Sequence, residues 1–252
     1  MRRPLVAALL TLLGAAEAGA WPAPVADGLV RHARRLLPAS LGLLMQERER
    51  EIREEAERLP AELVRALAAD TAAGRLQPAT VVAIEGRAAE ALQLMRQQRL
   101  TEGVVRLGAL YAIPMVLTDP ALAPAATVAP GISREYYAFL SANLDKIPVV
   151  LDDAAALQLD RRQLGSYWQG LLDRSRDHAP VIAGELFQGG RVLDHRAFDY
   201  RSPLFAVASL AYSRAVTGIA ATWLALWREA RGDLTRMPSP HEVHPQAPRI
   251  EP

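Results

Sequence analysis

The sequence predicts an all-α fold, a single domain of about eight helices, and three observations favour it. Apolar side chains recur at helical spacing along most of the 252 residues. Prolines and glycines interrupt this pattern at intervals of helix length. The sequence contains no alternating strand pattern, no phosphate-binding glycine loop and no internal repeat. Half of the residues are hydrophobic, which suffices for a sizeable core, and the absence of cysteine excludes disulfides and thiolate chemistry.

Residues 1–20 have the three parts of a secretory signal peptide. Two arginines give a positive start, residues 5–13 are apolar, and Ala18-Gly19-Ala20 fits the small-residue cleavage rule. The apolar run is too short to span a bilayer comfortably. We therefore expect cleavage near Ala20, a free amino group on Trp21, export to the periplasm or the medium, and no transmembrane span in the mature chain. The alternative is an uncleaved amphiphilic anchor.

The charge of the mature chain argues against a nucleic-acid partner. Loss of Arg2, Arg3 and Glu17 from the 29 basic and 28 acidic residues leaves 27 of each, so the net charge is zero. Nucleic-acid-binding domains normally show a net positive charge or a basic stripe, and the sequence has neither.

Five helices are expected in the first half of the chain, over residues 25–37, 41–59, 60–69, 78–98 and 102–117. Pro38 closes the first helix, Pro60 and Pro78 open the third and fourth, and Pro114 kinks or breaks the fifth. Residues 47–58 are rich in Glu and Arg spaced four apart. We interpret this run as a solvated helical face, with a charged partner site as the alternative.

A proline-rich loop over residues 120–133 opens the second half. The helices expected after it cover residues 134–144, 160–178, 181–187 and 202–230. Pro180 separates the second from the third, and Gly189-Gly190 ends the third. Ser40, Thr101 and Ser133 are each predicted to cap a helix.

The last helix should be the most buried element, and Pro203 lies in its first turn. Its apolar side chains are Leu204, Val207, Leu210, Ala211, Ile219, Ala220, Trp223, Leu224 and Trp227. Residues 232–252 are rich in proline and polar side chains, so we expect a disordered tail after a helical domain over residues 21–231.

Two stretches resemble bacterial members of the zinc-dependent phospholipase C and S1/P1 nuclease superfamily. The first is Trp21 after Ala20, with Arg-Arg-Leu-Leu-Pro-Ala-Ser-Leu at 34–41; the second combines residues 202–216 and 223–228. The resemblance covers most of residues 21–231 and implies an exported, all-helical protein. It further implies that active members bind zinc through the amino group and carbonyl of their first tryptophan. Their trinuclear zinc site activates water to attack a phosphodiester.

The same resemblance implies that this chain has lost most of the zinc ligands. Active relatives carry a His-x-x-x-Asp pair and then Pro-x-His in the region that matches residues 110–122. Pro120 keeps the proline of that pattern, but Ala112, Val116 and Leu122 stand at ligand positions. Of the five histidines, two lie in the expected tail, which leaves three. We therefore expect no cofactor, and zinc only if a reduced site survives.

A reduced zinc site would use the ligand types that remain. Its metal ligands would be Trp21, Asp119, His178 and His195, with His32 as a further candidate. Each has a simpler alternative. Trp21 would pack on the first helix, His32 would lie at the surface among positive neighbours, and His178 would stand at the end of its helix.

The loop before the last helix is the other candidate for polar chemistry, because loops carry sites more often than cores do. It contains Asp194, His195 and Asp199, together with Arg196 and Arg201. The alternative, which we favour, is a hydrogen-bonded anchor that holds the loop.

Three functions follow from these expectations. The leading one is a non-catalytic exported protein that binds an unidentified protein or an amphiphile through its degenerate cleft or its surface. The first alternative is a metal-dependent phosphodiesterase or phospholipase C with a reduced zinc site. The second is a helical protein that docks on a lipid surface through exposed apolar side chains.

Overall fold

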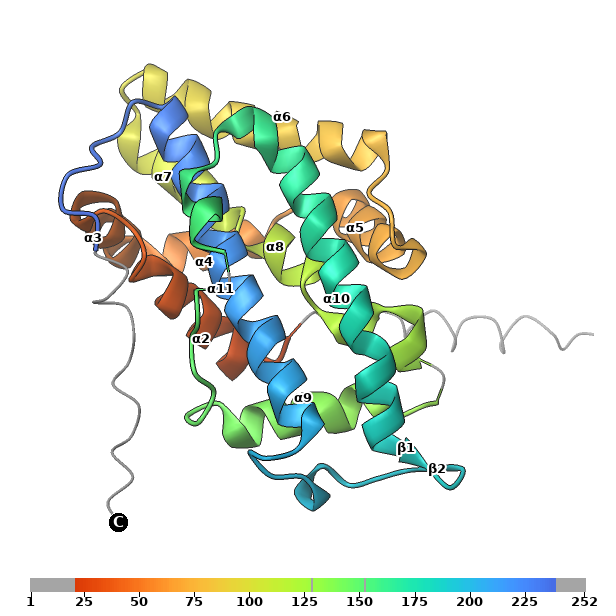
Figure 1. Cartoon of the computed structure of the whole chain (residues 1–252). Coiled ribbons are helices and arrows are strands. Elements are labelled where there is room, and N and C mark those ends of the chain that lie inside the picture. The colour runs from red at the N-terminus through yellow and green to blue at the C-terminus, as the bar shows by residue number, and fades with distance from the viewer. Residues whose placement is uncertain (1–20, 128, 152, 239–252) are drawn as a thin grey trace, which may run out of the picture.

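The structure is a computed structural model that describes residues 21–127, 129–151 and 153–238. Within them nearly all regular structure is helical, which confirms the all-α class (Figure 1). The first half contains α2 (Ala23–Arg34), α3 (Ala39–Glu47), α4 (Glu49–Glu57), α5 (Ala61–Ala73), α6 (Pro78–Arg96), α7 (Leu100–Ala109) and α8 (Ala112–Leu117). The second half contains α9 (Ile132–Asn143), α10 (Leu164–Leu186) and α11 (Pro203–Glu229). Short 3-10 helices join them: η1 (Pro120–Leu122), η2 (Pro124–Thr127), η3 (Ala154–Gln158), η4 (Arg161–Gln163) and η5 (His195–Ala197).

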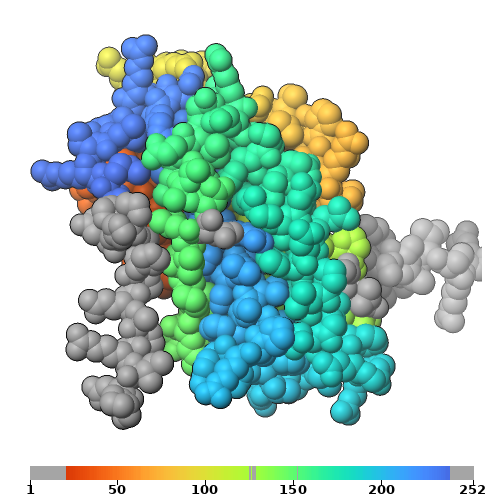
Figure 2. Space-filling model, viewed as in Figure 1, coloured from red at the N-terminus to blue at the C-terminus, as the bar shows by residue number. Residues whose placement is uncertain are grey.

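Helix α11 is the centre of the packing, as predicted. It lies along α10 and contacts α2, α8 and η3 (Figure 1). Two buried tryptophans tie it to its neighbours. The indole of Trp168 in α10 donates to the Thr222 hydroxyl at 3.1 Å, and that of Trp223 donates to the Gly108 carbonyl at 3.1 Å. Figure 2 shows the segment around η3 covering the upper part of α11 on this face. Of the apolar side chains predicted for the buried face, Leu210 is the exception, with 38% exposed.

Two segments are long and apolar enough to cross a membrane, judged by length and composition alone. They are Leu100–Leu117, of which 56% is buried inside the protein, and Pro203–Glu229, of which 72% is buried. The core helix of a protein that folds in water passes the same test, so these two segments are weak evidence for a membrane span.

Two long helices of the first half are each interrupted. The helix expected over 41–59 breaks at Arg48, where the backbone leaves the helical region (φ −109°, ψ 18°). The break lets α4 lie against α7, with Ile52 packed on Gly108, and the local sequence does not encode this tertiary contact. The helix expected over 102–117 divides at residues 110–111. Pro114 explains that position, because its ring conflicts with the carbonyl four residues earlier.

The expected break at Pro180 is wrong. Helix α10 runs through it to Leu186, so His178 stands inside a helix and not at its end. Gly189 and Gly190 do not end that helix either. Both have positive φ, 57° and 76°, and they form the turn of a two-residue antiparallel hairpin, β1 (Phe187–Gln188) with β2 (Arg191–Val192). This small hairpin also corrects the expectation that the chain has no strand.

None of the three predicted caps is one. Helix α3 begins one residue before Ser40, α7 one residue before Thr101, and α9 one residue before Ser133. Two of these hydroxyls bond elsewhere: Ser40 donates to the Asp233 carbonyl and Ser133 to the Ala121 carbonyl. Helix α5 continues four residues past the predicted end, and Gly74 terminates it in the left-handed conformation (φ 73°).

The predicted signal peptide, residues 1–20, lies outside the described residues, and so does 239–252 of the predicted tail, with His241 and His244. The first part of that tail is held at Asp233. Its carbonyl accepts the Trp227 indole N–H at 2.9 Å.

Candidate functional site

Asp119 is a fully buried carboxyl group at the entry to η1. It is 0% exposed. Its Oδ1 accepts the backbone N–H of Ala121 at 3.0 Å, which caps η1. Its Oδ2 accepts two further donors, the hydroxyl of Tyr137 at 2.7 Å and the backbone N–H of Trp21 at 3.3 Å. Three donors from separate parts of the chain therefore converge on one carboxyl group.

The electrostatics of this group are unusual because all three donors are neutral. Burial raises the pKa of Asp119 to about 6, and the hydrogen bonds from Tyr137, Ala121 and Trp21 only partly oppose it. No charged side chain in the described part of the chain contributes to this shift. Burial also raises the pKa of Tyr136 and Tyr137, and the nearby Asp119 carboxylate raises both further.

Trp21 is docked in the core at the beginning of the described chain. Its side chain is buried, and its indole N–H donates to the Met115 carbonyl at 2.8 Å. The structure thus brings together Trp21 and Asp119, two of the four predicted metal ligands, from positions 98 residues apart. The buried side chain of Trp21 agrees with the alternative interpretation, in which this tryptophan packs against the protein.

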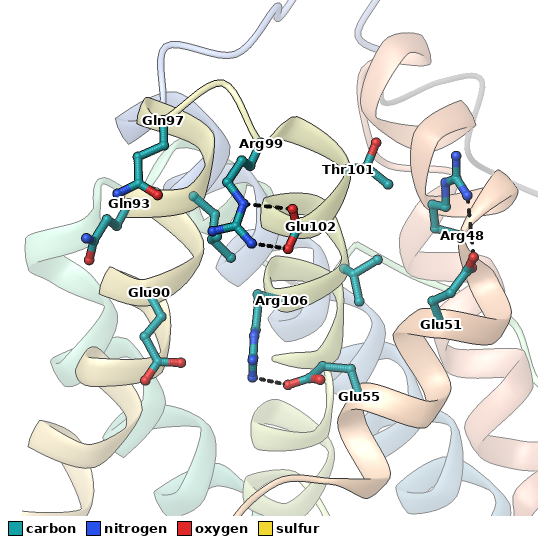
Figure 3. A pocket seen from close by; sticks show the side chains of 12 residues that line it. Arg48, Glu51, Glu55, Glu90, Gln93, Gln97, Arg99, Thr101, Glu102 and Arg106 are labelled. Carbon is teal, nitrogen blue, oxygen red and sulfur yellow. Dashed lines mark hydrogen bonds and ion pairs between the residues drawn. The ribbon is translucent and has the colours of Figure 1, made fainter.

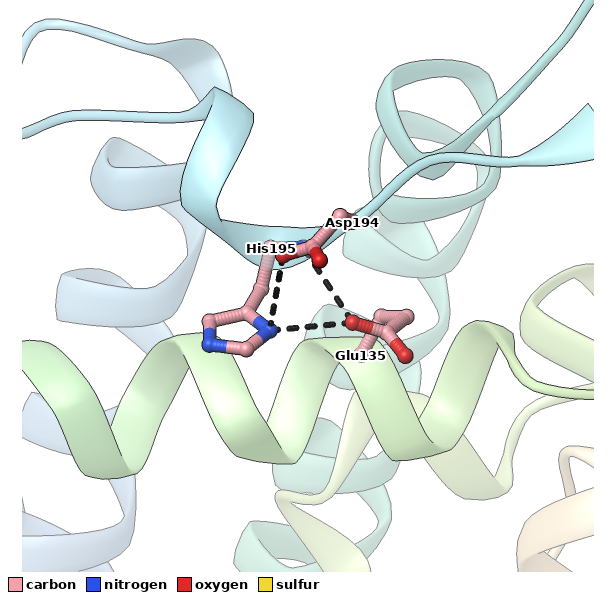
Figure 4. A group of neighbouring side chains, drawn as sticks. All are labelled: Glu135, Asp194 and His195. Carbon is pink, nitrogen blue, oxygen red and sulfur yellow. Dashed lines mark hydrogen bonds and ion pairs between the residues drawn. The ribbon is translucent and has the colours of Figure 1, made fainter.

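His195 belongs to a different cluster, which is built on the first turn of α9. Its ring Nδ1 lies 3.0 Å from Glu135 Oε2 and 3.4 Å from Asp194 Oδ1 (Figure 4). The same Glu135 oxygen accepts the backbone N–H of His195 at 3.2 Å. Asp194 caps η5 through the Arg196 N–H, and Arg134 lies 3.1 Å from the other Glu135 oxygen. The hydrogen bond from His195 is the main reason why the pKa of Glu135 is lowered.

In the described part of the chain, these three side chains form the one group whose ligand-type atoms all lie within 4.8 Å of one another. Those atoms already bond to each other and to the backbone of η5. The cluster therefore works as an anchor that fastens the loop to α9. Asp199 plays a similar local role, since it accepts the Arg201 N–H at 2.8 Å.

The remaining candidates lie apart from Asp119. His178 Nε2 faces the guanidinium of Arg214 at hydrogen-bond distance, so that the nitrogen accepts from a cation. His32 Nδ1 lies 3.0 Å from the Tyr212 hydroxyl. Burial, and then the charges of Arg35 and Arg31, lowers the pKa of His32 to about 4, which keeps the ring neutral.

A zinc cluster does not fit these residues. Zinc needs histidine nitrogens or carboxylates that converge on one point. Both oxygens of Asp119 already accept hydrogen bonds, and the three described histidines bond to Tyr212, Arg214 and Glu135 instead. The four predicted ligands therefore do not form one site among the described residues.

The cleft beside His32 joins cationic and apolar surface. One wall is the last turns of α2, with Arg31, His32 and Arg35, and the other is residues 141–149. The cavity measures about 420 Å³. Leu144, Ile147 and Val149 line it, and Asp145 is its acidic residue. No acidic side chain of the described chain forms an ion pair with either arginine.

A larger cleft, of about 760 Å³, lies between α4, α6 and α7 (Figure 3). Its charges are already satisfied. Arg106 and Arg87 both pair with Glu55, and Arg99 pairs with Glu102. The residues that line it belong partly to the Glu- and Arg-rich run, and their mutual pairing agrees with the solvated helical face expected there.

Sequence reasoning did not find several residues that shape these sites. Tyr137 and Glu135 were not singled out, because their partners are distant in the chain. The same holds for Tyr212 on α11. The spacing of Arg31 and Arg35, four apart on one helical face, was a signal available in the sequence.

Comparison with known proteins adds no identification. No protein-family model matches the chain, no curated protein matches it and no solved structure matches it.

Proposed function

We propose that the protein is an exported, non-catalytic helical protein that binds an anionic amphiphile in the cleft between α2 and residues 141–149. The resemblance to the zinc-dependent phospholipase C superfamily, with most ligand positions replaced, supports a binding role on a related helical fold. The signal-like residues 1–20 support export to the periplasm or the medium.

The observation that carries the proposal is the pair Arg31 and Arg35. Arg31 lies in the last turn of α2 and Arg35 directly follows its last residue, both are exposed, and no ion pair engages them in the described chain. Arginine donates two parallel N–H groups, which suits a phosphate or carboxylate. The larger cleft of Figure 3 offers no such group, because its arginines are already paired.

The apolar part of the ligand would lie against the opposite wall. Leu144 is half-buried there, and Ile147 and Val149 present a small part of their surface. The cavity falls within the range of about 300–1,000 Å³ that small-molecule sites occupy. Asp145 on this wall restricts the positive charge to the α2 side, so a single anionic headgroup with one apolar chain fits best.

The second candidate is a phosphodiesterase with a reduced zinc site, which would have to form at Trp21 and Asp119 in place of their present hydrogen bond. It needs stoichiometric zinc on the chain that begins at Trp21. Metal analysis of that chain, purified without a tag or chelator and then offered zinc, separates the two. Two or three zinc ions per chain would favour the enzyme.

The test of the leading proposal is calorimetric titration of the mature chain with dodecyl phosphate below its micelle concentration. We expect binding, and no binding of dodecyl maltoside, which carries the same chain without charge. The double variant Arg31→Gln/Arg35→Gln should weaken binding by about tenfold or more, since hydrogen bonds to charged groups contribute about 1.5–3 kcal/mol each.

The matched control is Arg161→Gln/Arg162→Gln in η4, which removes the same charge away from the cleft. If both double variants weaken amphiphile binding equally, the weakening is due to net charge alone and the proposal is wrong. Binding to phosphatidylglycerol vesicles without binding of the monomeric amphiphile would support the lipid-surface alternative instead.

A further inference from the structure

The backbone nitrogen of Trp21 points at a buried acid. It lies 3.3 Å from Asp119 Oδ2, inside the core, where the carboxyl group is 0% exposed. As an amide, this nitrogen carries one hydrogen and no charge. A buried carboxylate is costly unless a cation compensates it, and none does so in the described part of the chain.

The backbone at Trp21 shows a second peculiarity. Its φ is 37°, in the left-handed region that a bulky residue rarely adopts. The strain of a positive φ comes from the carbonyl group of the preceding residue. A residue without a preceding peptide bond has no such carbonyl, and the conformation then costs nothing.

The third observation is the sequence before Trp21. Ala18-Gly19-Ala20 fits the cleavage rule of signal peptidases. Hydrolysis of the Ala20–Trp21 bond consumes one water, leaves a carboxylate on Ala20 and gives Trp21 an amine. An α-amino group has a pKa of about 7.7–8.0, so at neutral pH this amine takes up a proton.

From these observations we propose that removal of the signal peptide creates a buried ion pair between the new Trp21 ammonium and the Asp119 carboxylate, and that this pair locks the folded mature chain. The proposal rests on the cleavage and export included in the proposed function, but not on any ligand of the α2 cleft. The ammonium group stands where the amide nitrogen now stands, with no movement of the chain required.

The surroundings of Asp119 can accept a cation. Tyr137 already donates to Oδ2, and the hydroxyl of the fully buried Tyr136 has no hydrogen-bond partner among the described residues. Both tyrosines stay protonated at neutral pH, because burial raises the pKa of each. No positively charged side chain of α5, α8, α9 or α10 donates a hydrogen bond to the Asp119 carboxylate.

The test compares two chains that differ by one residue. One begins at Trp21, and the other keeps Ala20, so that the nitrogen of Trp21 remains an amide while the net charge is unchanged. We expect the chain that begins at Trp21 to melt at least about 5 °C higher at pH 7, the effect expected for losing one member of a buried ion pair. In an Asp119→Asn background the difference should fall to about 1 °C or less.

The pH dependence of this difference is a second readout. In the chain with Ala20, the pKa of Asp119 is about 6 when folded, above its unfolded value of about 3.9, so the contribution of Asp119 to stability increases as the pH falls from 7 towards 4. In the chain beginning at Trp21 the ammonium lowers that pKa, so the contribution of Asp119 persists down to about pH 4. The difference in melting temperature should therefore shrink as the pH falls. His32 and Glu135 titrate alike in both chains.

Two further measurements keep the proposal falsifiable. Acetylation of the Trp21 amine removes the charge without adding a residue and should lower the melting temperature as Ala20 does. The intact mass of the exported protein should correspond to a chain that begins at Trp21. The proposal is wrong if the two chains have equal melting temperatures at pH 7. It is also wrong if the difference persists in Asp119→Asn, or if the exported chain begins at another residue. Amphiphile binding, measured separately, reports on the cleft and not on the Trp21–Asp119 ion pair.

Discussion

Gly28 on α2 leaves the space that the Tyr212 hydroxyl occupies. A Cβ atom at this position would lie 2.6 Å from that oxygen, and Tyr212 is fully buried and cannot move aside. The hydroxyl bonds to His32, which lines the proposed amphiphile cleft. At the scale of single residues, the lack of a side chain at Gly28 thus leaves room for the Tyr212 hydroxyl, which bonds to His32 in the cleft.

Replacing Gly28 by alanine should lower the free energy of unfolding by about 1 kcal/mol. Alanine gains up to about 1 kcal/mol in helix propensity, but overpacking costs about 1–3 kcal/mol, and the His32–Tyr212 hydrogen bond is lost as well. Urea unfolding measures the change. The control is Gly86→Ala on the exposed side of α6, where nothing lies within 4 Å of the new Cβ atom. That variant should be stabilised by about 0.5–1 kcal/mol. Stabilisation of both variants would show that the space beside Tyr212 is not tight.

The same scale shows what the sequence could reveal about the site. Trp21 was singled out by the family resemblance and Asp119 as one of the remaining residues of a ligand type, and the structure brings them together. Tyr137 completes the group through its place on α9, which no local pattern marks. The loop containing His195 was identified from its polar residues, whereas its partner Glu135 lies 60 residues earlier. Pairings of this kind depend on the tertiary fold, so sequence spacing does not predict them.

Helix α10 shows how an element can override a local signal. Pro180 lacks the backbone N–H that would bond to the carbonyl of Arg176, yet the helix continues for six residues beyond it. Buried Ala179, Ile182 and Leu186 hold this last part against the core. The tertiary burial of one helical face therefore outweighs the missing hydrogen bond.

Pro180→Ala should raise the free energy of unfolding by about 1–3 kcal/mol, because it restores that hydrogen bond and proline is about 3 kcal/mol worse than alanine inside a helix. Pro180 is exposed, so the substitution removes little packing. Thermal and urea unfolding measure the gain. Pro203→Ala is the comparison, because Pro203 occupies the first turn of α11, where proline suits the helix. It should not stabilise the protein. Equal gains at the two positions would show that the stabilisation does not come from the hydrogen bond restored inside α10.

Most helices were predictable from local pattern, and their interruptions were less so. Helices α6 and α11 begin and end within two residues of the predicted bounds, because periodic apolar side chains and prolines mark them. The break at Arg48 has no such signal and coincides with the packing of Ile52 on Gly108. The three predicted caps failed because each helix begins before the polar residue that was expected to start it.

At the scale of the whole molecule, the packing of α11 shows how the apolar length of this helix is to be interpreted. A 27-residue apolar helix is long enough for a membrane, but most of α11 is covered by α10, α2 and the segments around them. Trp223 and Tyr212 are buried against other helices and not exposed on an outer surface. This arrangement is that of a core helix.

We therefore expect alkaline carbonate to release the chain from membranes. Carbonate strips proteins that are held at a surface and leaves those that span the bilayer, so an integral helical membrane protein of the same host is the control. The fraction of the chain in the supernatant is measured after centrifugation. Retention in the pellet together with the control would mean that α11, the segment Leu100–Leu117 or residues 1–20 cross the membrane.

The position of α11 also sets when the molecule can fold. Its partners include α2, so the first and last helices of the described chain meet in one core, about 180 residues apart in sequence. A nascent chain that lacks residues 203–229 lacks the helix against which α2 and α10 each pack most extensively. Non-local contacts of this kind slow folding. The core can therefore be completed only when synthesis is almost finished, and a chain whose core is incomplete until then is suited to passing through a translocation channel in an extended form.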